Sequence, residues 1–258
     1  ANNAFGTAFE RMSQCRMPIP DVESQYVGAN TGMLRRRFGL RNFKIVVGEA
    51  ITQGPALKNT LLYVCLALLF ALTVQPLAAY ALSRFQPRGM WKLLFIFVAT
   101  MAFPPMVTLV PMFILYQKLN LINTIIGLAL PVSINGYLLF LLKGFFDSLP
   151  QHLYEAATID GASEFRMFWQ ITMSMSKPIL AVIALQTFKH AWMAFMMPLI
   201  FCPDEEKHVM AVWLHQFQME APTSAVFASI LIASVPTLLV FIFAQRTIMR
   251  GIAVPSEK

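Results

Sequence analysis

Lys189 and His190 are the ionisable side chains with the most unusual surroundings in this chain. They lie midway along an apolar segment that runs from Pro178 to Phe201. An ionisable group inside so apolar a segment is costly in a membrane unless it faces other protein groups or water, so such residues mark candidate pathways. Gln186 and Asn135 are weaker candidates of the same kind, because polar side chains also hold helices together. We expect these four residues either to line a pathway through the protein or to contact a neighbouring subunit.

A second polar group, residues 147–164, carries acidic charge and contains no lysine or arginine. Its charged side chains are those of Asp147, Glu155, Asp160 and Glu164. Amphipathic helices that rest on lipid headgroups usually display lysine and arginine, whereas anionic headgroups would repel this set. The composition therefore favours a protein partner over a lipid surface as the contact of this segment.

Local signals predict that this acidic segment forms two short helices. Ser148 and Gln151 have the spacing of a capping box, and Pro150 then falls in the first turn, where its missing N–H costs little. The first helix should therefore begin near Leu149. Gly161 is the natural place for a helix end or a sharp bend, because glycine tolerates the left-handed conformation. We predict two short helices that are hinged at Gly161.

Residue patterns that support catalysis or metal binding are missing from the sequence. It contains no GxxxxGK[ST] loop to cradle ATP phosphates and no GxGxxG, HExxH or GxSxG pattern. His208 and His215 do not have a ligand spacing, and the three cysteines include no CxxC pair. We expect this chain not to be an enzyme and to bind no metal or other cofactor itself.

The composition is that of an integral membrane protein. Hydrophobic residues make up 57% of the chain and charged residues 13%, whereas an average soluble domain carries about 25% charged residues. The net charge of +7 is explained by the excess of lysine and arginine that membrane proteins carry in cytoplasmic loops, and no nucleic-acid-binding pattern accompanies it. We therefore expect a protein in contact with membrane lipid and without a nucleic-acid partner.

Five apolar segments are long enough to cross a hydrocarbon core of about 30 Å. Backbone groups in lipid must bond to one another, so each segment should be a helix. The expected fold class is an all-α, polytopic inner-membrane protein. Prolines in the second segment should kink it. The segments are Leu61–Leu82, Leu93–Tyr116, about Thr124–Leu142, Pro178–Phe201 and Val226–Ala244.

Lysine and arginine are concentrated on one side of these predicted spans. The loops after the first, third and fifth spans carry most of them, so these loops, with the acidic segment and the C-terminus, should be cytoplasmic. Residues 1–56 then form an extracytoplasmic segment, residues 57–250 the transmembrane domain and residues 251–258 a cytoplasmic tail. Because residues 1–56 are themselves basic, a sixth span ahead of Ala1 would resolve the conflict with the charge rule.

The acidic segment contains Glu155-Ala156-Ala157 followed by Gly161 and Ile171, which is the spacing of the EAA motif of ABC-importer permease subunits. Asp160-Gly161-Ala162 also matches the common form of that motif. Over about residues 55–254 the chain resembles the second permease subunit of the carbohydrate-uptake, maltose-type branch. The stretches that carry the resemblance beyond the motif are KNTLLYV, LAAYALSRF, LNLINTIIGLALP, LLKGFFDSLPQHLYEAATIDGAS and QRTIMRGI.

The resemblance implies a cytoplasmic coupling helix, at about residues 150–170, that docks on an ATPase subunit. Glu155 and Asp160 would make polar contacts there, Ala156 and Ala157 would allow close approach, and Gly161 would set the bend. It further implies a bacterial inner-membrane location, a sixth span upstream, a sister permease subunit, two ATPase subunits that bind ATP and Mg, and an extracytoplasmic solute-binding protein. An acidic sugar is one solute that Lys189 could then meet.

The chain departs from the family pattern at two places. Met173 and Ser174 stand where the motif usually continues with Leu-Pro, so the helix after the bend is expected to run straighter, as far as Pro178. Met193 and Ala194 replace the polar pair of a common Trp-Asn-Glu-Phe stretch, so no role of that pair is carried over. Two other classes of protein remain alternatives, an ion-gradient-driven secondary transporter and a membrane-embedded signalling or scaffold protein.

Overall fold

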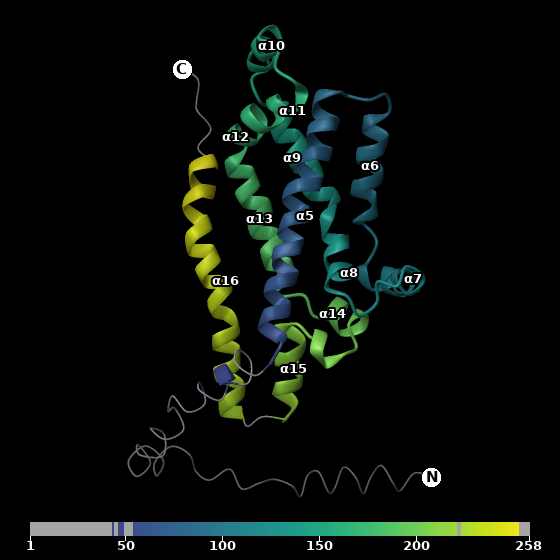
Figure 1. Cartoon of the computed structure of the whole chain (residues 1–258), viewed down its shortest axis with the longest axis vertical. Helices are drawn as coiled ribbons and strands as arrows, with labels where there is room; N and C mark the ends of the chain where they lie inside the picture. Colours follow the sequence, from purple (N-terminus) through teal and green to yellow (C-terminus); the bar gives the residue numbers. More distant parts are fainter. Residues whose placement is uncertain (1–42, 44–45, 49–53, 221–222, 253–258) are drawn as a thin grey trace, which may run out of the picture. The chain divides into compact units, whose positions relative to one another are not determined.

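The computed structural model describes residues 43, 46–48, 54–220 and 223–252 (Figure 1). Nearly all of the predicted extracytoplasmic segment 1–56 and most of the predicted tail 251–258 lie outside these residues. All regular secondary structure in the described part of the chain is helical, which confirms the predicted all-α membrane fold. Figure 1 labels the helices, and those labels are used from here on.

Helix α5 (Ala56–Arg84) is the central element among the described helices. Its neighbours are α8 (Ile125–Ala129), η2 (Leu130–Ser133), α9 (Gly136–Asp147) and α13 (Lys177–Trp192). Alanines on its buried side, at 67, 71 and 79, are fully enclosed. Small residues at a helix interface allow the backbones to approach closely, which explains how a single helix can contact several others.

Within the part of the chain that the structure describes, two helices are long and apolar enough to cross a membrane unbroken. They are α5 and, in α16 (Thr223–Ile252), the stretch Ala225–Gln245. Three further helix pairs meet the same test of length and composition together but are bent, by 102°, 46° and 80°. The total therefore reaches five spans if each bent pair is one span. The first and fifth predicted spans are confirmed as continuous helices, and the other three are interrupted.

The second predicted span is broken rather than kinked. Helix α6 (Met90–Thr100) ends before a short turn, and α7 (Pro105–Lys118) leaves at 102° to it. Proline lacks an N–H and keeps the preceding residue out of the helical conformation. Pro104 accordingly has an extended ψ of 131°, and Pro105 begins α7. Pro104 and Pro105 therefore end one helix and start another.

The fourth predicted span, Pro178–Phe201, is also wrong as one helix. Helix α13 ends at Trp192, and the chain restarts as α14 (Met196–Phe201). Pro198 lies in the first turn of α14, where a missing N–H is tolerated, but it would remove a backbone bond from an unbroken helix. Lys189 and His190 therefore lie in the last turn of α13 rather than midway along a helix.

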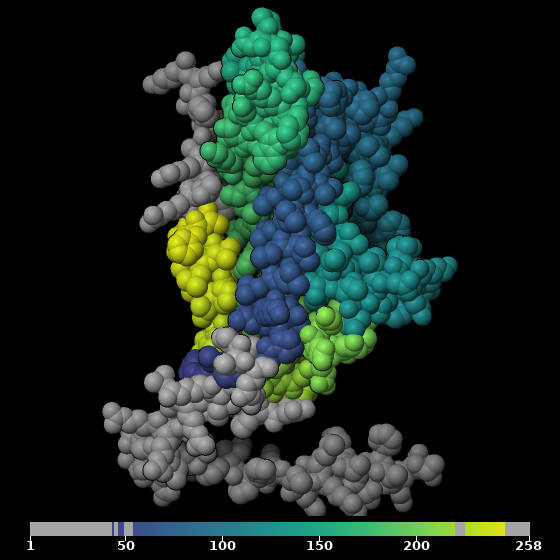
Figure 2. Space-filling model, viewed as in Figure 1, coloured from purple at the N-terminus to yellow at the C-terminus, as the bar shows by residue number. Residues whose placement is uncertain are grey.

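The end of α5 that carries Arg84 adjoins the segment with the EAA motif, and we call it the motif end. This segment contains α10 (Gln151–Ile159), α11 (Glu164–Met167), the π-helical turn η3 (Phe168–Thr172) and α12 (Met173–Met175). One buried cluster joins α5 to it, through Tyr80 and Leu82 on α5 and Tyr154, Met167 and Phe168 on the segment. Figure 2 shows the segment, in green, above the blue end of α5. The motif segment is therefore anchored to the membrane helices by apolar packing.

The remaining described elements lie at the opposite end. They are η4 (Glu205–Lys207) and α15 (Met210–Glu220), which follow α14. A second buried cluster there includes Tyr63, Tyr116, Leu128 and Phe201. The Asn59 amide donates to the carbonyl oxygens of Glu206 and His208, at 2.7 and 3.0 Å. These bonds attach the start of α5 to the loop between α14 and α15.

Candidate functional site

The bend in the motif segment is a closed helix C-terminus built on Gly161. Its φ of +73° is left-handed, as predicted, and only glycine adopts this conformation without strain. Gly161 N donates to Thr158 O at 3.1 Å and Ala162 N to Ala157 O at 2.9 Å. This pair of bonds is the Schellman pattern, in which an apolar contact between the residues in the positions of Ala157 and Ala162 often accompanies the turn. Both alanines are half-buried and pack on the motif-end core.

The start of α10 differs from the prediction, and the capping box is wrong. The Ser148 hydroxyl donates to the carbonyl oxygen of Phe145 at 2.7 Å, and Ser148 closes the C-terminus of α9. Helix α10 begins at Gln151, with Pro150 at its N-cap and no side-chain cap. The hydroxyl is drawn to the preceding helix because α9 ends at Asp147 with unpaired carbonyls. A cap that was not predicted occurs instead at Ser163, whose Oγ accepts from Arg166 N at 3.4 Å.

The predicted coupling residues divide into an inward and an outward group. Ala157 and Ala162 face the protein, whereas Glu155, Ala156 and Asp160 are exposed, as is Gly161 at the bend. Neither acidic side chain of this group has a hydrogen bond or ion pair within the described residues. Ile159 lies in the same outward face with 86% of its surface exposed. An isoleucine this exposed beside free carboxylates forms a surface suited to contact with another protein.

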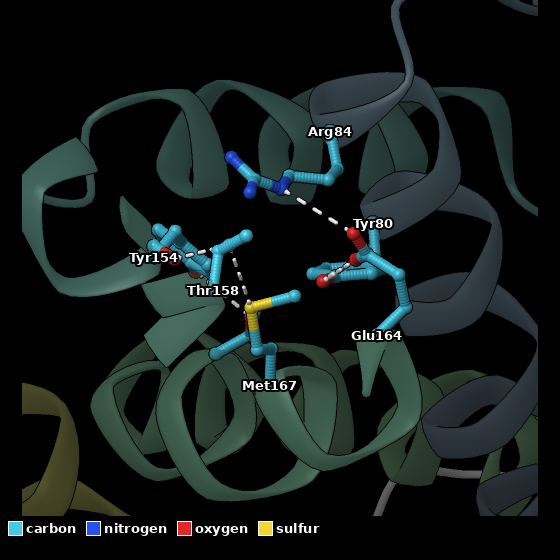
Figure 3. Close-up of polar contacts among 7 residues, drawn as sticks. Tyr80, Arg84, Tyr154, Thr158, Glu164 and Met167 are labelled. Atoms are coloured by element: carbon cyan, nitrogen blue, oxygen red, sulfur yellow. Dashed lines mark hydrogen bonds and ion pairs between the residues drawn. The ribbon is translucent and has the colours of Figure 1, made fainter. Parts of the chain in front are cut away.

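Glu164 attaches the motif segment to the end of α5 (Figure 3). The Tyr80 hydroxyl donates to its Oε2 at 2.7 Å, and Arg84 Nε lies 4.0 Å from its Oε1. The Arg84 guanidinium also lies over the Tyr154 ring, 4.9 Å from its centroid. The acidic charge of Glu164 was noticed in the sequence, but its partners were missed. The available signal was the spacing of Tyr80 and Arg84, which places both on one face of α5.

Further contacts within the segment hold α10 against the turn that follows α11. The Tyr154 and Thr172 hydroxyls are 2.8 Å apart and buried, and the Tyr80 and Phe168 rings meet edge to face at 5.2 Å. Figure 3 shows the side chains of Tyr154, Thr158 and Met167 gathered beside Arg84 and Glu164. The two short helices therefore form one connected unit with the end of α5.

The helix after the bend does not run straight, contrary to the expectation. It passes through the π-helical turn η3 and bends by 80° between Met175 and Lys177. Pro178 withholds an N–H from the carbonyl of Ser174, which removes one backbone bond and favours a bend at this point. The bend therefore occurs just before Pro178, although Ser174 itself lacks the proline of the motif.

A cavity of about 740 Å³ is lined by all four of the polar residues that the sequence marks as pathway candidates. It lies where three helix breaks meet, at the ends of α6 and α13 and at the start of α9. Asn135 contributes from the α9 N-cap, and Gln186, Lys189 and His190 come from α13. Its full lining is Met101, Pro131, Val132, Asn135, Tyr137, Leu138, Gln186, Thr187, Lys189, His190, Met193 and Ala194.

The polar groups of this cavity are largely unpaired. Asn135 Oδ1 accepts from Leu138 N at 3.1 Å, which leaves its amide N–H groups available. Within the described ranges, the side chains of Gln186, Lys189 and His190 have no hydrogen bond or ion pair. A lysine in the last turn of a helix is also stabilised by the negative end of the helix dipole, so the position of Lys189 has a structural explanation as well. The described residues contain no group of three or more His, Cys, Asp or Glu that could hold a metal ion.

Comparisons with known proteins agree on one family. Residues 76–253 match the family described as binding-protein-dependent transport system inner membrane component. The diacetylchitobiose uptake system permease protein NgcG of Streptomyces coelicolor is 32% identical over 206 residues, covering 78% of this chain and 68% of the relative. The sn-glycerol-3-phosphate transport system permease protein UgpE of Yersinia pestis is 32% identical over 193 residues, covering 72% and 68%.

The fold is also similar to that of a chain in the crystal structure of a bacterial ABC transporter involved in the import of the acidic polysaccharide alginate, with a TM-score of 0.68. The match covers 74% of each chain at 24% sequence identity, and at that identity the likeness concerns the fold alone.

Proposed function

The chain belongs to the family of binding-protein-dependent transport system inner membrane components, the permeases of ABC importers, and we propose that it forms one half of a pathway that carries a carbohydrate across the bacterial inner membrane. A sister permease supplies the other half, and two ATPase subunits bind ATP and Mg and drive the cycle. An extracytoplasmic solute-binding protein delivers the solute. The chain itself has no phosphate-binding loop, so ATP hydrolysis is assigned to the partner subunits.

The observation that carries this proposal is the outward face of α10. It presents Glu155, Ala156, Ile159 and Asp160 without partners inside the described chain, next to a bend that Gly161 closes. The segment behind that face is held to α5 by Glu164 and by buried aromatic packing. A surface that is exposed in front and anchored behind can transmit a displacement of a docked ATPase to the membrane helices. That transmission is a population shift driven by differential binding.

The substrate class is proposed from the relatives. NgcG is named for diacetylchitobiose uptake and UgpE for sn-glycerol-3-phosphate transport, so a sugar, an oligosaccharide or a phosphorylated polyol is the expected class. The cavity between α6, α9 and α13 is the proposed pathway contact of this subunit. Its volume of about 740 Å³ is within the range of small-molecule sites.

The test is ATP-driven uptake by the complete importer in proteoliposomes. Ile159→Glu should abolish co-purification of the ATPase subunits and uptake, because it places a charge on the docking surface without disturbing a contact within this chain. Ile159→Leu should retain both and serves as the matched control. Solute uptake that follows an ion gradient in the absence of ATPase subunits would refute the proposal in favour of a secondary transporter.

A further inference from the structure

Lys189 lies near the middle of the membrane-spanning region. Trp192 Nε1, one turn further along α13, donates to the carbonyl oxygen of Ala233 at 3.1 Å. Ala233 is inside the apolar stretch Ala225–Gln245 of α16 and well away from both of its ends. At a rise of about 1.5 Å per residue, Lys189 is only about 4.5 Å from the level of Trp192, on the side of the motif end. It is therefore far from the headgroups at either membrane surface.

The described membrane-spanning segments offer Lys189 no counter-charge at this depth. The sequence contains no Asp or Glu between residues 61 and 146, between 165 and 203, or between 225 and 245. A cation at the centre of a bilayer is costly when it faces lipid, so such residues line water-filled cavities or pair with an acidic group. Since Lys189 lines the cavity of about 740 Å³, its charge faces that cavity and has no counter-charge among the described residues.

The groups around Lys189 are suited to an anion. His190 and Gln186 carry N–H donors, and the amide of Asn135 has N–H groups that the Leu138 bond leaves free. The N-terminus of α9, a helix of 12 residues, opens at the cavity, and the positive end of a helix dipole favours negative charge. Thr187 also lines the cavity, and its buried hydroxyl oxygen has no hydrogen-bond partner among the described residues.

We propose that this cavity binds the anionic group, a carboxylate or a phosphate, of the transported sugar. Lys189 supplies the positive charge, and His190, Gln186 and Asn135 supply hydrogen bonds to the same oxygens. This inference rests on the proposed function, because it names the substrate class of that pathway. A lipid headgroup is a poor alternative source of the anion, since the cavity lies near mid-depth. The two remaining possibilities, a neutral sugar and an acidic residue of the sister subunit, are outcomes of the test.

The test measures the charge of the cavity through a cysteine placed in it. Met193→Cys, four residues from Lys189 and exposed in the same cavity, is introduced into the assembled importer after the native cysteines are replaced by alanine. Its rates of reaction with anionic sulfonatoethyl and cationic trimethylammonioethyl methanethiosulfonate are compared. An unpaired charge about 6–7 Å away should raise the anion-to-cation rate ratio about tenfold. Lys189→Met should remove that preference, and Lys189→Arg should keep it. In the control Gln117→Cys, at the far end of α7, the rate ratio should not change with either substitution of Lys189.

Ligand protection then identifies the chemistry of the solute. Galacturonate probes a carboxylate and sn-glycerol 3-phosphate a phosphate, with galactose and glycerol as their neutral counterparts. At least one acid should slow modification of Cys at position 193 several-fold more than its neutral counterpart does, and Lys189→Met should abolish that protection.

Three results would overturn the inference. The first is a cysteine at position 193 that does not react. The second is an anion-to-cation rate ratio that is the same with and without Lys189, as pairing of Lys189 with an acid of the sister subunit would produce. The third is ligand protection that is absent or is equal for the acid and neutral probes. Each of these leaves the proposed function standing if the same membranes show ATP-dependent uptake. Loss of ATP dependence, in contrast, would remove the proposed function itself.

Discussion

Replacing Glu164 by glutamine should loosen the motif segment without unfolding the helices that carry it. In the native protein the carboxylate accepts a hydrogen bond of 2.7 Å from Tyr80 and lies 4.0 Å from Arg84 Nε. Glutamine keeps the shape and one neutral acceptor oxygen but removes the charge. The change therefore affects the electrostatic part of the attachment and spares the apolar packing of Tyr80 on Phe168.

The expected loss follows from these two contacts. A hydrogen bond to a charged acceptor is worth about 1 kcal/mol more than one to a neutral acceptor. The ion pair adds about 0–0.5 kcal/mol, because the side chains of Arg84 and Glu164 are 26% and 45% exposed and water screens them. Glu164 also lies in the first turn of α11, where a negative charge contributes a few tenths of a kcal/mol, about 0.3. The total is about 1–2 kcal/mol, which corresponds to about a 5–30-fold change in the population of the detached segment.

Amide hydrogen exchange of residues 151–167 in the purified importer measures this population directly. Glu164→Gln should accelerate exchange there by about 5–30-fold, whereas Glu205→Gln, the same change at an exposed residue at the opposite end of the described helices, should have no effect. Tyr80→Phe should resemble Glu164→Gln, and the double variant should add little, because both remove one contact. Transport should fall relative to ATP hydrolysis. Equal exchange in the Glu164→Gln and Glu205→Gln proteins would refute the reasoning.

Three further predictions concern backbone geometry and thiol chemistry. Gly161→Ala should cost about 1–2 kcal/mol, because its φ of +73° is strained for any other residue and the added methyl meets nothing; uptake should fall while membrane abundance, measured by immunoblot, stays constant. Gly136→Ala should lower the Tm of the purified importer, because its methyl would overlap the carbonyl of Phe97 and overpacking costs about 1–3 kcal/mol. The control is Gly144→Ala on the same helix. Its methyl meets nothing, so it should stabilise the protein by up to about 1 kcal/mol. Burial raises the pKa of the Cys202 thiol to about 11, so the reactive thiolate is scarce below that pH. In a variant that retains only this cysteine, maleimide labelling at pH 9 should therefore be slow, with labelling after denaturation as the control. Rapid labelling of the folded protein at pH 9 would contradict this prediction.

The features that the sequence determined by itself are those encoded over short stretches. Apolar length and the need to satisfy backbone groups in lipid led directly to membrane helices, and α5 and α16 agree with that prediction. The left-handed bend at Gly161 followed from the conformational freedom of one residue. The spacing of Glu155, Ala157 and Gly161 belongs to the same class of local signal, since the Schellman turn involves only neighbouring residues.

Local signals failed where two neighbouring elements competed for the same group. Ser148 has the spacing to cap α10, but its hydroxyl serves the end of α9. The prolines of the second span led to the prediction of a kink, whereas the structure has a break with a bend of 102° between α6 and α7. The size of the bend could not be predicted, because it depends on what the freed backbone groups contact elsewhere.

Only the tertiary structure decided which distant residues meet. Tyr80 and Glu164 are separated by 84 positions, and their contact exists because the end of α5 packs on the motif segment. The cavity of Asn135 and Lys189 likewise exists because three helix breaks fall at one level of the bundle. Hydrophobic length and backbone preference are properties of a few consecutive residues, whereas these contacts depend on how whole helices pack against one another.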